Sequence, residues 1–422
     1  MRVAVIGGGA SGMMSAGVCA KNGHTVDLFE ANEKLGKKLY ITGKGRCNVT
    51  NACQIDELLN NVVTNSKFLY SSLNAFDSFS TINFFESLGV PIKIERGNRA
   101  FPVSDKSSDI IKALSNFITK NGVNILLNHK VESIEKENDK FCITTKYGKY
   151  NNYDATICCT GGATYSATGS TGDGYKFALH FNHNVSKIRP ALVPIKLKDS
   201  FVKQVEGLSL KNVKLIALEN GKPVKEFFGE MLFTANGLSG PIALSMSSYI
   251  NKLNSVELKI DLKPALTNEQ LINRILREIE SNRQMQVSTL MSGLLPKSLV
   301  EHFLNTCKIE KTLRVKSLNT KLIELIANKL KNFNLKYDCL EKLDYGIITS
   351  GGVNVNEVNP KTMESKLVKG LYFAGEVLDV DALTGGFNLQ IAFSTGFLAG
   401  SSIWLSIIWI FELIPIVTNN DI

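Results

Sequence analysis

The fold of this chain is decided by residues 2–30, RVAVIGGGASGMMSAGVCAKNGHTVDLFE. Residues 2–6 and 25–29 are short apolar runs of the kind found in buried strands. Between them, residues 10–22 are mostly small and apolar and predict a close-packed helix. A strand, a helix and a strand within about 30 residues predict a βαβ unit.

The turn after the first strand carries Gly7, Gly9 and Gly12, in the spacing of a dinucleotide-binding turn. In such a turn the first glycine permits the bend, the second admits a pyrophosphate close to the backbone, and the third lets the helix pack against the strand. The free N–H groups of the helix then face the phosphates. Glu30, 18 positions after Gly12, follows the second strand and can accept hydrogen bonds from a ribose diol. A tight turn alone explains neither Gly12 nor Glu30, so the sequence predicts a dinucleotide site.

Residues 36–51, GKKLYITGKGRCNVTN, form a second motif that is rich in hydrogen-bond donors. Gly45 is followed by Arg46 and Asn48. Such a loop suits contact with a cofactor, although by its chemistry alone an ordinary capped turn fits equally well. We interpret Cys47, beside Arg46, as a packed small residue rather than a reactive thiol.

A third motif, CCTGGATYSATGSTGDGY, covers residues 158–175. A predicted strand ends here at Gly161 and Gly162, which indicates a close approach of the backbone to the cofactor. Cys158 and Cys159 are interpreted as buried strand thiols, because a disulfide between neighbouring residues requires unusual backbone strain.

A fourth motif, GLYFAGEVLDVDALTGGFNLQIAFSTG, covers residues 370–396. Gly375 follows an apolar strand, and Gly386 runs into a helix, so a second helix amino terminus is expected at the cofactor. Asp379 and Asp381 are interpreted as ligands of the cofactor or of the loop, not as an acid–base pair.

Composition narrows the class of protein. The 422 residues are 44% hydrophobic and 21% charged, which is typical of a globular protein with a substantial core. The net charge of +9 could suit an anionic cofactor, an acidic substrate or loose nucleic-acid contact, but the basic residues are scattered, which argues against nucleic acid. Eight cysteines without CxxC pairs or metal-ligand spacing predict a reduced, metal-free cytoplasmic protein.

The two ends of the chain add further expectations. A first strand at residue 2 leaves no room for a signal peptide. Residues 403–417, IWLSIIWIFELIPIV, are almost wholly apolar, and about 15 residues fall short of the ~20 that a spanning helix needs. The stretch predicts a buried or interface helix, with contact to a membrane surface as the alternative.

The remaining periodicity predicts that the first domain is interrupted by an insertion. Expected in the first domain are helices at 75–88 and 107–120 and strands at 123–127, 141–146 and 155–159. Alternating runs from residue 191 to about 262 predict a β-rich insert, and helical spacing follows at 267–342. Because glycines return after residue 345, the C-terminal segment is expected to complete the first domain. The predicted domains are 1–192 with 343–422, 193–265, and 266–342.

These four motifs together resemble the flavoprotein family of BaiN-type or aminoacetone-oxidase-family proteins, which is related in its cofactor domain to fumarate reductases and p-hydroxybenzoate hydroxylases. The resemblance covers almost the whole chain. Further matching stretches are RAFPVSDKSSD at 99–109, RPALVPI at 189–195, GEMLFTANGLSGP at 229–241, LLPK at 294–297 and TSGGVNVNE at 349–357.

The resemblance implies an α/β protein with a Rossmann-like FAD-binding domain built from both chain ends, an inserted β-rich domain and a small helical domain. Carried over by motif, the implied FAD contacts are Gly7, Gly9, Gly12, Glu30, Lys38, Gly45, Arg46, Cys47, Asn48, Gly162, Gly375, Glu376, Asp379, Gly386, Asn388 and Leu389. The implied substrate-side residues are Arg99, Phe101, Thr234, Ser239 and Thr349, and all of these except Phe101 are candidate catalytic residues.

The resemblance also implies redox chemistry linked to NAD(P)H or oxygen on a small organic substrate. The leading hypothesis is hydride transfer from NAD(P)H through FAD to a small acceptor with an activated C=C or C=O bond. Since there is a single dinucleotide motif, NAD(P)H is expected to bind transiently over the flavin. An oxygen-dependent amine oxidase is a second hypothesis. A non-catalytic, RNA-associated flavoprotein is a third, and the net charge of +9 is its only support.

Overall fold

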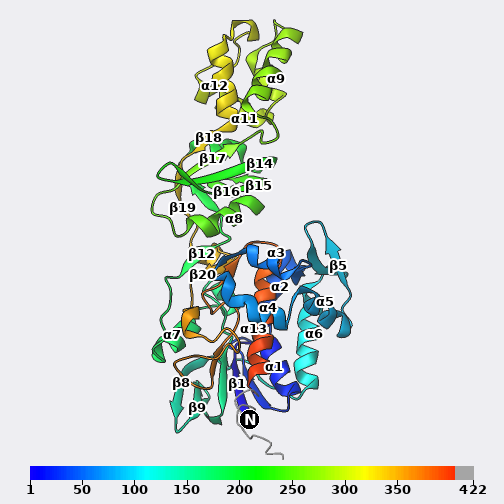
Figure 1. Cartoon of the computed structure of the whole chain (residues 1–422), viewed down its shortest axis with the longest axis vertical. Coiled ribbons are helices and arrows are strands. Elements are labelled where there is room, and N and C mark those ends of the chain that lie inside the picture. The colour runs from blue at the N-terminus through cyan, green and yellow to red at the C-terminus, as the bar shows by residue number, and fades with distance from the viewer. Residues whose placement is uncertain (404–422) are drawn as a thin grey trace, which may run out of the picture. The chain divides into compact units, whose positions relative to one another are not determined.

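The computed structural model describes residues 1–403 of the chain. It contains two compact units, described separately here (Figure 1). The first unit is Met1–Arg189 with the segment that begins at Ile347, and the second is Pro190–Gly346. The apolar stretch at 403–417, for which the sequence predicts a buried or interface helix, lies outside the described residues after Ile403.

A five-stranded parallel sheet forms the centre of the first unit, in the order β21-β11-β1-β2-β7. Its strands are β1 (Arg2–Ile6), β2 (Thr25–Phe29), β7 (Asn124–Leu126), β11 (Ala155–Cys158) and β21 (Leu371–Phe373). β21 comes from the C-terminal segment and pairs with β11, so that both chain ends build this sheet. The predicted α/β fold and its βαβ unit are confirmed.

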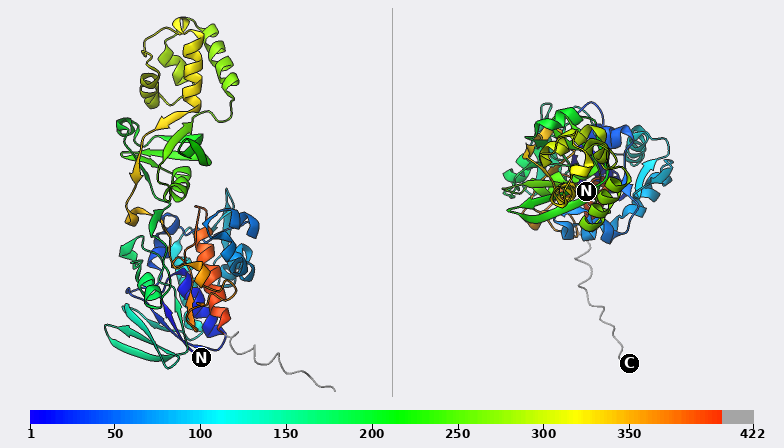
Figure 2. Two further views of the ribbon diagram at one scale, coloured as in Figure 1. Left: turned by 60° about the vertical axis from the view of Figure 1, so that its left-hand side comes forward. Right: turned by 90° about the horizontal axis from the view of Figure 1, so that it is seen from above.

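Helix α1 (Ala10–Lys21) packs on this sheet, and α6 (Ser107–Lys120) and α13 (Phe387–Ser402) pack against α1. α13 lies along α1 (Figure 2). A Cβ added at Gly396 of α13 would lie only 2.6 Å from the backbone oxygen of Ser11 in α1. Glycine therefore sets how closely the C-terminal helix approaches the N-terminal one.

A three-stranded antiparallel sheet in the order β10-β9-β8 also belongs to the first unit. It comprises β8 (Val131–Glu137), β9 (Lys140–Thr145) and β10 (Gly148–Tyr153). The sequence predicts only the middle strand. The outer two are rich in charged and amide side chains, because much of their surface faces solvent, and their apolar alternation is weak.

The remaining elements of the first unit are short. Its helices are α2 (Lys37–Ile41), α3 (Ile55–Asn60), α4 (Tyr70–Ala75), α5 (Ser78–Ser87) and α7 (Asp173–His180), with a 3₁₀ turn η2 (Ser66–Leu69). Its small strands are β3 (Thr50–Asn51), β4 (Val62–Thr64), β5 (Ile92–Glu95), β6 (Arg99–Pro102), β20 (Ile348–Ser350) and β22 (Asp381–Ala382). The helix predicted at 75–88 begins later, at Ser78, because the side chain of Asp77 caps it by accepting a hydrogen bond from Ser80 N at 2.7 Å.

The second unit is built on a seven-stranded antiparallel sheet in the order β18-β17-β14-β15-β16-β13-β19. Its strands are β13 (Ile195–Leu197), β14 (Ser209–Glu219), β15 (Lys222–Thr234), β16 (Gly237–Ser239), β17 (Glu257–Asp261), β18 (Phe333–Leu335) and β19 (Tyr337–Leu340). β12 (Arg189–Ala191) spans the point where the chain passes from the first unit to the second.

Helices complete the second unit: α8 (Pro241–Ile250), α9 (Asn268–Ser281), α10 (Val287–Ser292), α11 (Lys297–Cys307) and α12 (Thr320–Lys331). β18 and β19 lie in the segment whose periodicity predicts helix, and they are strands because they pair with β17 and β13. Buried side chains of the sheet and of the helices join in one hydrophobic cluster. The division of this region into separate domains at residue 265 stays a prediction.

None of the helices within residues 1–403 combines the length and the apolar character that crossing a bilayer requires.

Candidate functional site

The three glycines after β1 differ in the space that a Cβ would have at each position. Gly7 has a φ of +103°, and a Cβ there would lie 2.5 Å from the backbone oxygen of Cys159. A Cβ on Gly12 would lie 1.8 Å from Gly7 O. A Cβ on Gly9, by contrast, would have no heavy atom of the protein within 4 Å. Protein packing explains Gly7 and Gly12, whereas Gly9 leaves open space that a ligand can approach.

Helices α1 and α13 both begin at a glycine without a side-chain cap. α1 has Gly9 at its N-cap and no acidic residue in its first turn. α13 has Gly386 at its N-cap, with a φ of +100°, and likewise no acidic residue in its first turn. Such ends present backbone N–H groups and the positive end of the helix dipole to an anionic or polar ligand.

Glu30 is fixed beside the glycine turn. Its Oε2 accepts a hydrogen bond from Gly8 N at 2.7 Å, and its Oε1 accepts one from Asn32 N at 2.8 Å and one from Asn32 Nδ2 at 2.6 Å. The residue is buried. The turn thus orients this carboxylate, and its contact with a ribose stays a prediction.

Four predicted residues from separate parts of the first unit meet in one group of polar side chains and backbone, which we call the Lys38–Glu376 cluster. Its members are Lys38, Gly162, Thr349 and Glu376. Lys38 Nζ donates to Glu376 Oε2 at 2.7 Å. Thr349 N donates to Glu376 Oε1 at 2.8 Å. A Cβ on Gly162 would lie 2.2 Å from Thr349 Oγ1, so the cluster has no room for a side chain at this position.

Two further contacts hold the cluster together. Thr164 Oγ1 accepts a hydrogen bond from Lys38 Nζ at 2.9 Å, and Thr349 Oγ1 accepts one from Ala163 N at 2.8 Å. Thr349 is buried, and both its backbone N–H and its hydroxyl are engaged. Thr349 therefore positions Glu376 through its backbone N–H. A role of Thr349 at the substrate stays a prediction.

The loop at residues 43–47 has an unusual backbone. Gly43, Lys44, Gly45 and Cys47 all have φ between +57° and +84°. Left-handed conformations at Lys44 and Cys47 are strained, and such strain gathers at ligand-binding positions. Cys47 is fully buried, and this burial raises the pKa of its thiol to about 12, as suits a packed side chain.

Two amide oxygens after this loop are buried and have no hydrogen-bond partner among the described residues: Asn48 Oδ1 and Asn51 Oδ1. Asn51 Nδ2 donates to Gly385 O at 3.1 Å, which ties β3 to the loop before α13. A buried acceptor is normally paired, so these two oxygens are suited to donors of a bound ligand.

Arg46 lies in a separate group of charged residues on β5, β6 and the adjoining loops. Its Nε donates to Asp105 Oδ1 at 2.8 Å, and its Nη2 donates to Glu95 Oε1. The hydrogen bond from Arg46 to Glu95 holds the pKa of the Glu95 carboxyl below its usual range. The Arg46 guanidinium lies over the Phe101 ring at 4.1 Å from the centroid, with Arg99 at 5.7 Å. The structure thus brings together Arg46, Arg99 and Phe101.

Some predicted residues of the fourth motif pack against the rest of the first unit, and others hold its loops by hydrogen bonds. A Cβ on Gly375, whose φ is +79°, would lie 2.5 Å from Ser11 Oγ. Asp379 Oδ2 accepts a hydrogen bond from Ser186 Oγ at 2.7 Å. Asn388 Oδ1 accepts from Ala382 N at 3.0 Å, so this side chain closes the loop before α13. Leu389 is partly buried against the core.

Thr234 and Ser239 belong to the second unit. Thr234 is the last residue of β15, Ser239 is the last residue of β16, and these strands pair with each other. The predicted cofactor contacts and Arg99, Phe101 and Thr349 all belong to the first unit. The roles of Thr234 and Ser239 stay predictions.

Sequence reasoning missed several partners of the predicted residues. Thr164 lies inside the third motif, where its polar side chain was the available signal. Glu95 and Asp105 are 49 and 59 positions from Arg46, and no local pattern connects them. Within residues 1–403, no group of three or more His, Cys, Asp and Glu side chains is arranged to hold a metal ion.

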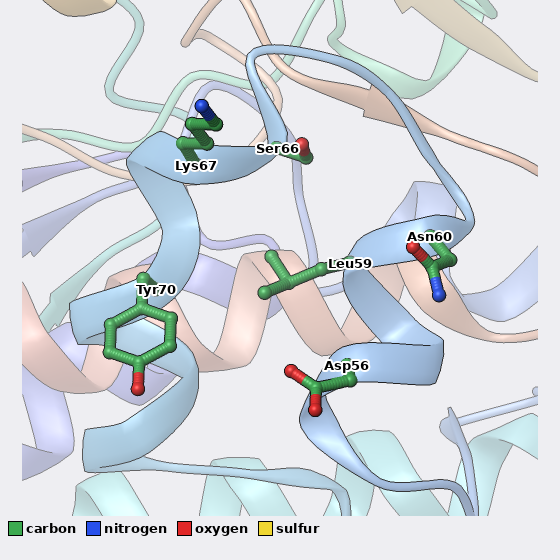
Figure 3. A pocket seen from close by; sticks show the side chains of 6 residues that line it. All are labelled: Asp56, Leu59, Asn60, Ser66, Lys67 and Tyr70. Atoms are coloured by element: carbon green, nitrogen blue, oxygen red, sulfur yellow. The ribbon is translucent and has the colours of Figure 1, made fainter.

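A surface pocket of about 430 Å³ lies between α3 and the η2–α4 segment (Figure 3). It is lined by Asp56, Leu59, Asn60, Ser66, Lys67 and Tyr70. None of the predicted site residues lines it. The neighbouring Asn65 Nδ2 donates to Asp379 O at 2.7 Å and connects the segment to the fourth motif.

A parallel sheet, an open glycine turn at an uncapped helix and an acidic residue after the second strand define a dinucleotide-binding protein of the Rossmann type. Residues 1–402 match the family described as the HI0933-like protein Rossmann domain. The chain therefore belongs to this family, and the predicted family resemblance is confirmed.

Relatives and solved structures agree with this assignment. The chain is 30% identical to a 3-dehydro-bile acid delta(4,6)-reductase of Clostridium scindens, over 94% of this chain and 98% of the relative. It is also 30% identical to a ribosomal RNA dihydrouridine synthase of Haemophilus influenzae, over 94% of this chain and 97% of the relative. A 3-ketosteroid delta1-dehydrogenase of Sterolibacterium denitrificans shares the fold, with a TM-score of 0.51, 12% identity, and 96% and 99% of the two chains covered.

The residues present fit FAD. The space at Gly9 and the uncapped start of α1 suit its pyrophosphate, and Glu30 stands at the same turn. Further hydrogen-bond acceptors are the side-chain oxygens of Asn48 and Asn51, which have no partner among the described residues. Further donors are the backbone N–H groups at the uncapped start of α13, after Gly386. The protein belongs to a family of FAD-dependent oxidoreductases, and its residues fit this cofactor.

Proposed function

We propose that this protein is a reductase that uses FAD and NAD(P)H to reduce a C=C bond conjugated to a carbonyl group. The observation that carries the proposal is the chemistry shared by the two relatives that align over nearly their full length. A 3-dehydro-bile acid with Δ4 and Δ6 double bonds and the uracil ring of uridine both contain such a bond. The sequence-level hypothesis of an activated C=C acceptor agrees with this chemistry.

Bound FAD would supply the hydride carrier between donor and acceptor. The protein's own groups bind and orient it: the amino terminus of α1 for the phosphates, Glu30 for the ribose, and the Lys38–Glu376 cluster for a polar part of the site. Arg99, which lies by Phe101 and whose side chain is 45% exposed, is the candidate for contact with the acceptor.

The distribution of charge favours RNA as the acceptor. The second unit, residues 190–346, contains 23 Lys and Arg against 16 Asp and Glu, which gives a net charge of +7. The first unit, with 25 against 23, carries only +2. A concentrated basic charge attracts a polyanion. We therefore place a uracil base in RNA first, and the small organic acceptor expected from the sequence second.

In the first step of the test, NADH or NADPH is added anaerobically to the purified holoenzyme. Reduction is measured as the loss of flavin absorbance at about 450 nm. The reduced enzyme is then mixed with ribosomal RNA transcribed in vitro, with uridine, or with an enone steroid, and free FAD is the control. Reoxidation by RNA together with formation of dihydrouridine supports the proposal.

The other outcomes separate the alternatives. Reoxidation by the enone alone would assign a small-molecule substrate. Failure of both nucleotides to reduce the flavin would contradict the NAD(P)H part, and fast reoxidation in air with release of peroxide from an amine substrate would favour the oxidase. The cytoplasmic location predicted from the sequence is checked separately by cell fractionation.

A further inference from the structure

Two loops of the second unit lie side by side at the ends of helices α9 and α11 (Figure 1). Val287 N donates to Leu313 O at 2.8 Å, and Val315 N donates to Met285 O at 2.9 Å. These backbone bonds fix the loop after α9 against the loop that joins α11 to α12.

The paired loops and the first turn of α12 carry a concentration of basic side chains, which we call the basic edge. Its members are Arg283, Lys308, Lys311, Arg314, Lys316 and Lys321, and all six are exposed. Residues 308–321 contain five of them and a single acid, Glu310. The excess positive charge of the second unit is therefore concentrated here, in two loops that are fixed to each other and in the helix turn that follows them.

Most of this charge is not neutralised by the protein. Lys311 Nζ lies 3.2 Å from Glu301 Oε1, and Arg314 Nη1 donates to Gln284 O. Among the described residues, no ion pair engages Arg283, Lys308, Lys316 or Lys321. Four cations without an ion pair in residues 1–403, three on the fixed loops and Lys321 on α12, form a surface of high positive potential.

The chemistry of the basic edge selects one kind of partner. None of the exposed large hydrophobic side chains of the described chain falls at 282–288 or 308–321, although insertion into a membrane surface requires apolar residues beside the basic ones. The side chains are chiefly lysines, which bind phosphates as point charges without reading base edges. A phosphate backbone fits, and a lipid bilayer fits poorly.

We propose that the basic edge is a docking surface for the phosphate backbone of structured RNA. This inference rests on the RNA acceptor proposed above. The contact is independent of sequence and sensitive to salt, and it supplies affinity, while selection of the base is left to the site in the first unit.

The experiment compares two quadruple variants of the FAD-loaded full chain, each of which loses four positive charges. The test variant is R283Q/K308Q/K316Q/K321Q, and the matched control is K112Q/K120Q/K146Q/K149Q, at exposed lysines of the first unit. Binding of a fluorescein-labelled RNA stem-loop is measured by anisotropy over a range of salt concentrations. The rate of flavin reduction by NAD(P)H and the melting temperature are recorded in parallel.

The test variant is expected to bind RNA at least about tenfold more weakly, with a salt slope reduced by roughly 3 for four lost phosphate contacts. The control is expected to change much less in both quantities. Flavin reduction and melting temperature should stay unchanged in both variants, since none of these residues belongs to the cofactor site.

Equal losses in the two variants, or no loss in the test variant, would overturn the docking surface. The same holds if the wild type binds anionic vesicles or an acidic peptide and not RNA. If RNA binding depends on the basic edge but reduced enzyme never modifies RNA, the docking surface stands and the proposed acceptor fails. If NAD(P)H does not reduce the flavin, the reductase proposal fails independently of either binding result.

Discussion

Lys38 and Glu376 are 338 positions apart in the sequence, yet Lys38 Nζ lies 2.7 Å from Glu376 Oε2. Their side chains are only 23% and 21% exposed, so that neither charge is well solvated alone. Substitution of Lys38 by Met should lower the free energy of unfolding by about 2 kcal/mol, since it leaves a half-buried carboxylate without its charged partner. Urea unfolding of the FAD-free protein measures this change.

Lys214 and Glu226 offer a matched control for this pair. Their contact is 2.8 Å long, but Glu226 is 59% exposed. Lys214→Met should cost less than about 1 kcal/mol. Equal effects of the two substitutions would contradict the structural importance of the Lys38–Glu376 pair.

Substitutions at Gly9 and Gly12 of the glycine turn should affect different properties: FAD binding at Gly9 and stability of the fold at Gly12. Gly9→Ala should leave the melting temperature of the FAD-free protein unchanged, because its Cβ meets no protein atom within 4 Å, but should weaken FAD binding by at least about tenfold. Gly12→Ala should instead destabilise the fold by about 1–3 kcal/mol, because its Cβ would lie 1.8 Å from Gly7 O. Flavin fluorescence titration and thermal melting give the two readouts, and tight FAD binding by Gly9→Ala would show that the open space is not the pyrophosphate position.

Arg99 should affect the acceptor half-reaction and little else. Its side chain is exposed, and its nearest charged contact, Arg99 Nη2 to Glu95 Oε2, is 3.9 Å long. Arg99→Gln is therefore expected to change stability by less than about 0.5 kcal/mol and to leave flavin reduction unaltered, while reoxidation by the acceptor slows by about tenfold or more. Arg96→Gln, at an exposed neighbouring position, is the control. If both variants turn over like the wild type, Arg99 has no role at the acceptor.

Buried thiols should make the protein less stable in alkali. Burial raises the pKa of Cys158 to about 11, from an ordinary value of 9.0. Above about pH 9 the unfolded chain loses this proton while the native chain keeps it, so the free energy of unfolding falls as pH rises, by roughly 1 kcal/mol for this thiol at pH 10. Urea unfolding between about pH 8 and pH 10 should show a shallower decline for Cys158→Ala than for wild type. Identical slopes would contradict the assignment.

Local patterns predicted much of the first unit. β1, α1 and β2 agree with their predicted ranges to within a residue, because each satisfies a simple periodicity next to a glycine turn. α6 was likewise predicted at its observed residues, 107–120. Short strands such as β18 and β19 were missed, because three or four residues contain too little alternation to outweigh the helical spacing around them.

The candidate site was predictable only in part. The roles of Gly7, Gly9 and Gly12 follow from their positions in the turn, whereas Lys38 and Glu376 were proposed only by family resemblance. Their contact depends on how the C-terminal segment joins the sheet at β21, which no local pattern contains. The same is true of Arg46, whose partners Glu95 and Asp105 are distant in the sequence and are connected to it by no local pattern.

The position of β21 and α13 after the second unit has a consequence for synthesis of the protein on the ribosome. Residues 190–346 are contiguous and are synthesised together. By contrast, β11 has no partner on one edge until Leu371–Phe373 has been synthesised, and α1 cannot pack against α13 until Gly396 has been synthesised. An unpaired strand edge is prone to wrong associations while it waits. Synthesis of the first unit, which contains the predicted FAD site, begins before that of the second unit and ends after it. FAD binding is therefore expected only after nearly the whole chain has been translated.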